Sequence, residues 1–394
     1  MIKTISSSQE NTGFQIHTFR NLVIGAWIIM QAILLWKNGI GITGEAEKYI
    51  YEAKYFLTNE ALTSKNFYFY SVNITLIALG LKWNFGYYPI VIIQLLLNLT
   101  ATLIFFRFCI SRFNLTTGLL ATILLIVFYP FQQFNTFLQT ESIFYSLLII
   151  FTCYLLSSNQ FGRTKLMVLI FILSLLIFTR PTGILLLIPA FCFFYFKYIR
   201  HFRMSKQILS LVLAALIYFA GLNSIMRSGG ELNFLLPYIE EHIICGVPTS
   251  SETHELLKPV DNSFGAILSY IGTHFSQFLS LGLRRSIAFF GIGRVYFSAL
   301  HNIVICSCFY LLYIFSVLSI RRWWKEDLNA LFYLFTTVAV TWVTAVLTCD
   351  DWHNRFILSV YPVFIVLSLP FIHKCTERYK IFRHRSDPKK KSQV

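Results

Sequence analysis

Ten apolar stretches dominate this sequence and restrict the folds that are open to it. Of 394 residues, 56% are hydrophobic and only 13% are charged, which excludes a soluble globular domain. A helix needs roughly 20 apolar residues to cross a hydrocarbon core, and the shorter stretches reach this length with flanking aromatic, Asn, Lys or Arg residues. We therefore predict an all-α, polytopic integral membrane protein with about ten transmembrane helices. The stretches are Val23–Trp36, Tyr88–Phe106, Leu115–Phe128, Ser142–Leu156, Leu166–Thr179, Thr182–Phe196, Ile208–Leu222, Ala299–Ile320, Leu328–Leu347 and Phe356–Phe371.

The segment Leu166–Phe196 is apolar enough to be read as one helix. A single helix over it would be about 46 Å long, too long for one crossing. Its middle holds Arg180 and Pro181, a charge followed by a helix breaker. We predict two short spans that turn at Arg180.

The basic residues indicate how the predicted spans are oriented. Of 33 Lys and Arg residues, 21 fall on the face that holds both termini, and most of the others lie in two long loops opposite. Because short cytoplasmic loops are enriched in Lys and Arg, we predict that both termini are cytoplasmic, in an inner or plasma membrane. The net charge of +15 is then mainly a signal of orientation, and the basic tail, residues 374–394, also attracts anionic membrane lipid. No nucleic-acid partner is expected.

The acidic residues gather on the predicted outer face. We expect one transmembrane domain, residues 1–394, with long outer loops at 37–87 and 225–298 and a short one at 348–355. Of the 18 Asp and Glu residues, 13 fall on this face and none falls within an apolar core. An acidic layer at the lipid boundary indicates chemistry on a lipid-borne substrate rather than a transport path. Its members include Glu45, Glu47, Glu52, Glu141, Glu240, Glu241, Asp350 and Asp351.

The first outer loop contains an amphipathic pattern over Glu45–Leu57. Thr43 is placed to cap this helix, and acidic residues in its first turn favour the positive end of the helix dipole. A second interfacial stretch follows at Phe67–Leu81. We predict that both are juxtamembrane helices and that Glu45 lies at the depth of a lipid phosphate. At helical spacing, the apolar stripe is Tyr49, Ala53 and Phe56, and the polar stripe is Glu45, Lys48 and Glu52.

Sugar transfer at this depth needs a base and a set of cations. Nucleotide-activated sugars are absent outside the cytoplasm, so a sugar transferred there has to arrive on a membrane lipid. A carboxylate takes the proton of the acceptor as it attacks the anomeric carbon, and cations hold the departing lipid phosphate. Glu45 is the candidate base. The candidate cations are Lys65, Lys82, Arg180, Arg284, Arg285, Arg294, His353 and Arg355.

The run from Gly44 to Ala53 resembles the first-loop motif of GT-C glycosyltransferases that use polyprenyl-phosphate sugars. The similarity is to the branch of the protein O-mannosyltransferases and the lipid A aminoarabinose transferases. In that motif an acid stands four residues before a Tyr, and a small residue follows four further on, here Glu45, Tyr49 and Ala53. The acid is usually Asp and its neighbour is often acidic, whereas this chain has Glu45 and Ala46.

Further motifs of that branch follow in the same order. Lys65 resembles a Lys that precedes a Pro-Pro pair, although other residues replace the prolines here. Glu141 stands before an apolar helix, as an acid of the second outer loop does. The run Arg180-Pro181-Thr182-Gly183 is similar to an Arg-Pro-Thr-Gly turn. Asn354-Arg355-Phe356, followed by Tyr361-Pro362, is similar to the pattern that opens the late helices.

The resemblance implies an enzyme of the cell envelope, a GT-C-type membrane glycosyltransferase. Its donor would be a polyprenyl-phosphate sugar, its acceptor a glycan, lipid or protein, and its mechanism an inverting single displacement with Glu45 as base. Each expected role has a structural alternative, because acids suit helix amino ends, arginines suit membrane interfaces, and the pair Asp350-Asp351 can form salt bridges with its neighbours. Substrate contacts are expected at Tyr49, Lys65, Glu141, Arg180, His353 and Arg355.

Two other functions are compatible with a chain of this kind. An O-antigen-type polymerase or ligase carries essential arginines on large outer loops, and Arg284, Arg285 and Arg294 meet that description. A lipid or solute transporter is less well supported, since transporters place charged residues inside their spans and these apolar cores contain none.

The cysteines and histidines predict no cofactor and no metal site. The spacing of His242, Cys245 and His254 matches no closed zinc pattern. Cys245 and Cys349 both lie on the predicted outer face, but spacing alone leaves open whether they form a disulfide.

Overall fold

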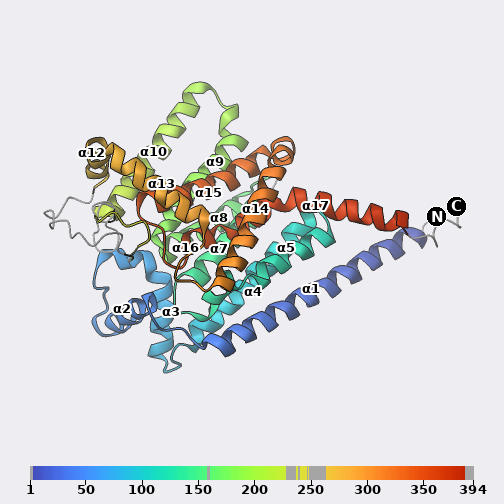
Figure 1. The fold of residues 1–394 in the computed structure, drawn as a ribbon, viewed down its shortest axis with the longest axis horizontal. Coiled ribbons are helices and arrows are strands. Elements are labelled where there is room, and N and C mark those ends of the chain that lie inside the picture. Colours follow the sequence, from blue (N-terminus) through green and yellow to red (C-terminus); the bar gives the residue numbers. More distant parts are fainter. Residues whose placement is uncertain are drawn as a thin grey trace.

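The computed structural model describes residues 3–157, 160–227, 237, 240–245, 247 and 263–386. The predicted second outer loop and the basic tail are therefore described in part, and His254 lies outside the described residues. In the described residues the chain is helical, with two isolated β-bridges and no strand longer than these. Figure 1 shows the start of α1 and the end of α17 at one end of the molecule, with α2 and α3 at the other. The elements are α1 (Lys3–Asn38), α2 (Glu45–Asn59), η1 (Lys65–Tyr70), α3 (Ser71–Lys82), α4 (Tyr88–Arg112), α5 (Leu115–Val127), α6 (Tyr129–Gln132), η2 (Gln133–Thr136), α7 (Glu141–Leu156), α8 (Arg163–Thr179), η3 (Pro181–Leu186), α9 (Leu187–Lys197), η4 (Ile199–His201), α10 (Met204–Arg227), α12 (Phe264–Thr273), α13 (Phe275–Gly291), α14 (Ala299–Glu326), α15 (Leu328–Leu347), α16 (Arg355–Ser359) and α17 (Tyr361–Ser386).

Every predicted apolar stretch lies on helical structure, which confirms the all-α polytopic membrane fold. By length and composition, six helices of the described chain can each cross a membrane, and a seventh crossing results if α5 and the segment Tyr129–Thr136, bent by 64°, count as one. The number is below ten partly because α7 and α8 have only 16 and 17 residues.

The predicted break at Arg180 is confirmed. Helix α8 ends at Thr179, Arg180 is extended, and η3 begins at Pro181. Gly183 lets the chain return closely onto α8, because a Cβ atom there would lie 2.3 Å from the carbonyl oxygen of Leu176. The turn thus holds Arg180 at the junction of α8 and η3.

The helix predicted at Glu45 begins there, but Thr43 does not cap it. The residue before its first turn is Gly44, with φ of +66°, and no side chain makes a capping hydrogen bond. A glycine adopts this left-handed conformation without the penalty that a Cβ atom brings, and so the chain turns sharply into α2.

Helix α2 packs against α3 with Tyr49 and Ala53 of the predicted apolar stripe buried, whereas the third member of the stripe, Phe56, is 38% exposed. The predicted polar stripe is wrong at Glu52, which is buried. Glu52 accepts hydrogen bonds from the backbone N–H of Thr63, at 3.1 Å, and from its hydroxyl. A carboxylate whose oxygens are satisfied by a neighbouring loop can be buried on the packed face.

Helix α7 is central in the molecule (Figure 1). Fourteen of its 16 residues are buried, and it packs against α4 and α8. Because α7 is enclosed, the residue that begins it, Glu141, is also fully buried. The position of this helix therefore places a carboxylate in the interior, at the end of the bundle where α2 lies.

Candidate functional site

Arg355 is the centre of a cluster of carboxylates from three distant segments. Its Nη2 atom lies 2.7 Å from Oε1 of Glu45 and 2.5 Å from Oδ2 of Asp351. Its Nη1 atom bonds Oε2 of Glu45 and lies 3.1 Å from Oε1 of Glu141. The side chain of Glu45 is 36% exposed, whereas those of Glu141 and Asp351 are 0% and 7% exposed. One guanidinium therefore joins an accessible carboxylate to two buried ones.

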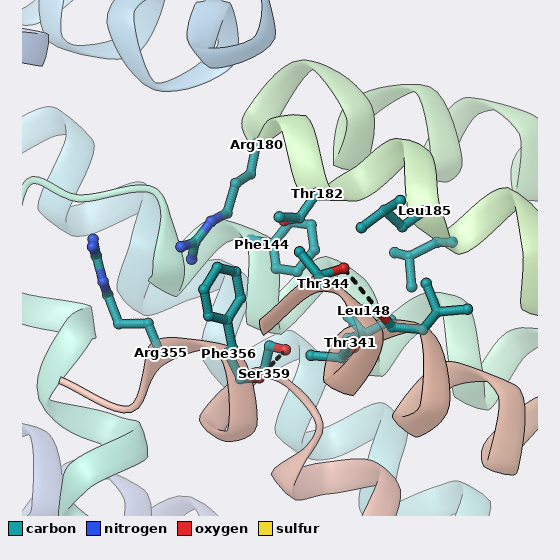
Figure 2. A pocket seen from close by; sticks show the side chains of 12 residues that line it. Phe144, Leu148, Arg180, Thr182, Leu185, Thr341, Thr344, Arg355, Phe356 and Ser359 are labelled. Atoms are coloured by element: carbon teal, nitrogen blue, oxygen red, sulfur yellow. Dashed lines mark hydrogen bonds between the residues drawn. The ribbon is translucent and has the colours of Figure 1, made fainter. Parts of the chain in front are cut away.

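Arg180 supplies a second guanidinium to the same cluster. Its Nη1 atom lies 2.8 Å from Oε1 of Glu141, and its charge lies 5.7 Å from the centre of the Phe356 ring. Figure 2 shows Arg180 and Arg355 approaching from different elements, with Phe356 beside them. Lys48 adds a third cation, with its Nζ atom 3.8 Å from Oε2 of Glu45. Three cations thus face three carboxylates.

Two buried polar atoms of the cluster have no hydrogen-bond partner in the described chain: Oε2 of Glu141 and Nε of Arg355. Buried polar groups are normally paired, and unpaired ones are found where a ligand or water completes the site. A donor and an acceptor are therefore available to a substrate.

The loop before α16 gives Arg355 its position. Asn354 has a left-handed backbone, with φ of +59°, and its side-chain Nδ2 donates to the carbonyl of Ile292 at 2.8 Å. Asp351 accepts a hydrogen bond from the backbone N–H of His353 at 2.9 Å. These local bonds turn Asp351 and Arg355 toward the same side.

The electrostatics of the cluster differ from one carboxylate to the next. Burial opposes ionisation of Glu45, but the hydrogen bond and charge of Arg355, with smaller effects from Lys48 and Arg180, outweigh it and lower its pKa to about 2. For Asp351 burial is likewise outweighed by Arg355, so its pKa lies well below the usual range. Both carboxylates are therefore ionised at neutral pH.

Asp350 behaves differently from its neighbour. Burial raises its pKa to about 6, although it pairs with Arg294. His353 has a lowered pKa because it is partly desolvated and because Arg355 repels its charged form, against the attraction of Asp351. His353 is therefore mainly neutral at pH 7, which weakens its candidacy as a phosphate-binding cation.

Of the other two predicted substrate contacts, Tyr49 lies next to the cluster and Lys65 does not. Tyr49 is buried one turn after Glu45, with its ring 5.3 Å from that of Tyr70 and the Nζ atom of Lys48 5.0 Å from its centre. Burial raises the pKa of Tyr49, and the charges of Tyr70, Glu45 and Glu141 raise it further. Lys65 is exposed at the start of η1, and the described ion pairs do not include it. The structure therefore leaves Lys65 outside the cluster.

Two of the candidate cations are engaged elsewhere. Arg285 is fully buried and donates to three backbone carbonyls. Arg294 is also buried and pairs with Asp350. Arg284 and Lys82 are exposed and take part in none of the described ion pairs. The set of cations that meets the carboxylates is thus smaller than the sequence suggested.

Sequence reasoning left three members of the cluster out of the predicted site. Asp351 is expected from the sequence in the acidic layer and in salt bridges with its neighbours, but not among the site residues, although its spacing of four residues from Arg355 is a signal for an ion pair with that residue. Lys48 lies one turn from Glu45, which is a similar signal. Phe356 belongs to the Asn354-Arg355-Phe356 motif, but as the first residue of an apolar stretch it gives no signal of a contact with Arg180.

A small cavity of about 20 Å³ adjoins the two arginines. Such a volume holds a water molecule but not a sugar. The wall combines cationic, hydroxyl and apolar side chains. They are Phe144, Leu148, Arg180, Thr182, Leu185, Leu186, Val340, Thr341, Thr344, Arg355, Phe356 and Ser359.

A larger cavity, of about 380 Å³, lies at the opposite ends of α4, α7 and α9. Its charged residues have structural roles. Arg112 pairs with Asp327, which also accepts a hydrogen bond from the N–H of Ala330, at 3.0 Å, at the start of α15. No group of three His, Cys, Asp or Glu residues suited to a metal ion is present in the described chain.

One comparison with known proteins bears on this site. Residues 72–223 match the family model described as dolichyl-phosphate-mannose-protein mannosyltransferase. The match covers less than half of the chain, from α3 to α10, and includes Glu141 and Arg180. No curated protein matches the chain. The family is of the GT-C type, and the match indicates glycosyltransferase activity in a membrane setting.

Proposed function

Taking the chain as a membrane glycosyltransferase of the GT-C superfamily, we propose that it moves a sugar from a polyprenyl-phosphate donor to an acceptor on the extracytoplasmic face. The observation that carries this proposal is the ion pair between Glu45 and Arg355 beside the buried pair of Glu141 and Arg180. A partly exposed carboxylate next to two guanidinium groups is what an acceptor hydroxyl and a lipid phosphate require.

Glu45 is the proposed base. It takes the proton of the acceptor hydroxyl while the acceptor oxygen forms its bond to the anomeric carbon. In the same step the bond from that carbon to the phosphate oxygen breaks, and its electron pair leaves with the lipid phosphate. A single displacement of this kind inverts the anomeric configuration.

Arg180 and Arg355 are the proposed phosphate ligands. Guanidinium groups bind phosphate oxygens through paired hydrogen bonds, and they stabilise the negative charge that develops as the phosphate leaves. Leu148, Leu185 and Val340 line the adjoining cavity, but at about 20 Å³ this cavity has to widen before an isoprenoid chain can pack against them.

We further propose that donor binding makes Glu45 a stronger base. Both guanidinium groups are bound to carboxylates here, and the cavity is too small for a sugar phosphate. A donor phosphate that takes Arg355 from Glu45 removes the main influence that lowers the pKa of this carboxyl. Glu45 then becomes a stronger base only when the donor is present, which suppresses proton transfer without substrate.

The polymerase or ligase alternative requires arginines that are free to bind substrate on an outer loop, and two of its three candidate arginines are not free. Arg285 and Arg294 are buried and already hold backbone carbonyls and Asp350. Only Arg284 of that group is exposed. Transport is disfavoured by the polar residues inside the bundle, since Gln94 and Asn98 make structural hydrogen bonds, to Phe137 and Trp27 among others.

Replacing Glu45 with Gln tests the proposal. Turnover with a polyprenyl-phosphate sugar should fall by about 10² or more, as expected for loss of a general base. Glu47→Gln, an exposed acid of the same helical turn, is the matched control and should retain activity. Unchanged turnover of Glu45→Gln would exclude Glu45 as the base, and a product with retained anomeric configuration would exclude single displacement.

A further inference from the structure

The loop that carries Asp351 and Arg355 is tied to the second outer loop of the chain. Cys245 and Cys349 form a disulfide, with their Cα atoms 5.3 Å apart across a sequence separation of 104 residues. The sequence had left this pairing open. Cys349 stands two residues before Asp351, so the crosslink lies next to the carboxylate that holds Arg355.

Backbone hydrogen bonds reinforce the crosslink. Ile244 and Asp350 form an isolated parallel β-bridge. The N–H of Asp350 donates to the carbonyl of Ile243 at 2.9 Å, and the N–H of Cys245 donates to the carbonyl of Asp350 at 2.8 Å. Both backbone groups of Asp350 are therefore fixed by the second outer loop.

Arg285 joins the two segments on the other side of the disulfide. It donates to the carbonyls of Pro237 at 2.7 Å, His242 at 2.9 Å and Val346 at 2.9 Å, and it is 0% exposed. A buried guanidinium keeps its charge, so its carbonyl partners compensate for lost hydration. This arginine thus holds the last turn of α15, directly before the Arg355 loop, against residues 237 and 242.

The side chain of Asp350 completes the connection. It pairs with Arg294 and accepts a hydrogen bond from the N–H of Asp351 at 2.9 Å. Asp351 in turn lies 2.5 Å from Nη2 of Arg355. A continuous chain of contacts therefore runs from the disulfide to the guanidinium at the centre of the site.

We infer that the Cys245–Cys349 disulfide and Arg285 form a clamp whose role is to position Arg355 for the reaction. The inference rests on the proposed function. Cys245, Cys349 and Arg285 are positioning residues, since they act through Asp350, Asp351 and the backbone of the loop. Misplacement of a reacting or binding group by about 1 Å can cost about 10²-fold in rate, so a loose loop is expected to be poorly active.

The clamp also makes activity depend on an oxidising compartment, where disulfides persist. A dithiol reagent such as dithiothreitol reduces the disulfide to two thiols and is itself oxidised to a cyclic disulfide. Opening the clamp in this way leaves every residue of the cluster chemically unchanged.

The test compares sugar transfer by the purified full-length protein before and after dithiothreitol. We expect kcat to fall about tenfold on reduction, and a Cys245→Ser/Cys349→Ser variant to show the same low kcat with no further response. Cys375→Ser, at an exposed free cysteine, is the control and should respond as the wild type does. Because reduction acts on folded protein, it gives an answer even if the serine variant fails to fold.

A second measurement separates positioning from general stability. In an Arg355→Lys background the positioned group is already lost, so reduction should lower kcat by less than about twofold, as coupled sites behave in a double-mutant cycle. An equal loss in both backgrounds would overturn the clamp as a positioning device. Wild-type transfer that is unaffected by complete reduction would also overturn it, while the Glu45→Gln result tests the proposed function separately.

Discussion

Arg355 holds the carboxylate of Glu45 with both of its terminal nitrogens, across a sequence separation of 310 residues. The contact joins the start of α2 to the start of α16. It brings the proposed base to the proposed phosphate ligand, and it makes the acidity of Glu45 depend on what else Arg355 binds.

Replacing Arg355 with Lys should lower kcat/KM for the donor by about 10² or more. Lysine keeps the charge but lacks the planar pair of donors that binds a carboxylate or phosphate at two oxygens. Steady-state kinetics with varied donor checks this, with the exposed Arg284→Lys as control. A similar loss in both variants would contradict a specific role for the guanidinium group of Arg355.

Replacing Glu141 with Gln should destabilise the protein by about 3–5 kcal/mol, because it leaves buried guanidinium charge without its counter-ion. Thermal unfolding in detergent, followed by tryptophan fluorescence, measures the change. Glu326→Gln removes the partner of Arg322 in an exposed ion pair and should cost about 1 kcal/mol or less. Equal melting temperatures of the two variants would contradict the buried role of Glu141.

The ion pair of Glu45 should contribute stability that depends on pH. The pKa of the Glu45 carboxyl is lowered to about 2 in the folded state. The stabilisation by the ion pair is therefore fully present above the ordinary pKa of 4.5 and is lost as the pH falls toward 2. The difference in melting temperature between wild type and Glu45→Gln should shrink over that range. If the difference in melting temperature stays constant from pH 7 to 3, the ion pair of Glu45 does not make the stability depend on pH.

Replacing Gly183 with Ala should lower both stability and transfer activity. The added Cβ would lie 2.3 Å from the carbonyl oxygen of Leu176, so the turn that carries Arg180 has to move. Gly162→Ala is the control, because a Cβ atom there meets nothing within 4 Å. Thermal unfolding and turnover of the two variants measure the effect, and an active, stable Gly183→Ala would show that the turn adjusts without moving Arg180.

Single cysteines placed at Glu60 and Gln160 should be labelled from opposite sides of the membrane. Glu60 ends the α2 segment of the predicted outer face, and Gln160 lies in the short connection before α8. A membrane-impermeant maleimide added to intact and opened vesicles distinguishes the two. Labelling of both from the same side would contradict the predicted topology.

Much of the fold was predictable because apolar periodicity is a local property. The helices at Tyr88, Ala299 and Leu328 begin where the apolar stretches begin, and the break at Arg180 follows from a charge next to a proline. The start of α2 at Glu45 was also predicted. Its cap was assigned to the wrong residue, since the entry into the helix depends on the backbone angle of Gly44.

The sequence by itself determined that the chain is a helical membrane protein and that Glu45, Glu141, Arg180 and Arg355 are available for chemistry. These properties can be predicted because hydrophobicity, charge and short motifs are local features of the sequence. Only the tertiary structure decided that these four residues form one cluster and that Lys65 lies outside it. It also decided that Arg285 donates hydrogen bonds to backbone carbonyls. Those outcomes depend on how helices pack, and contacts between residues hundreds of positions apart leave no signal in local spacing.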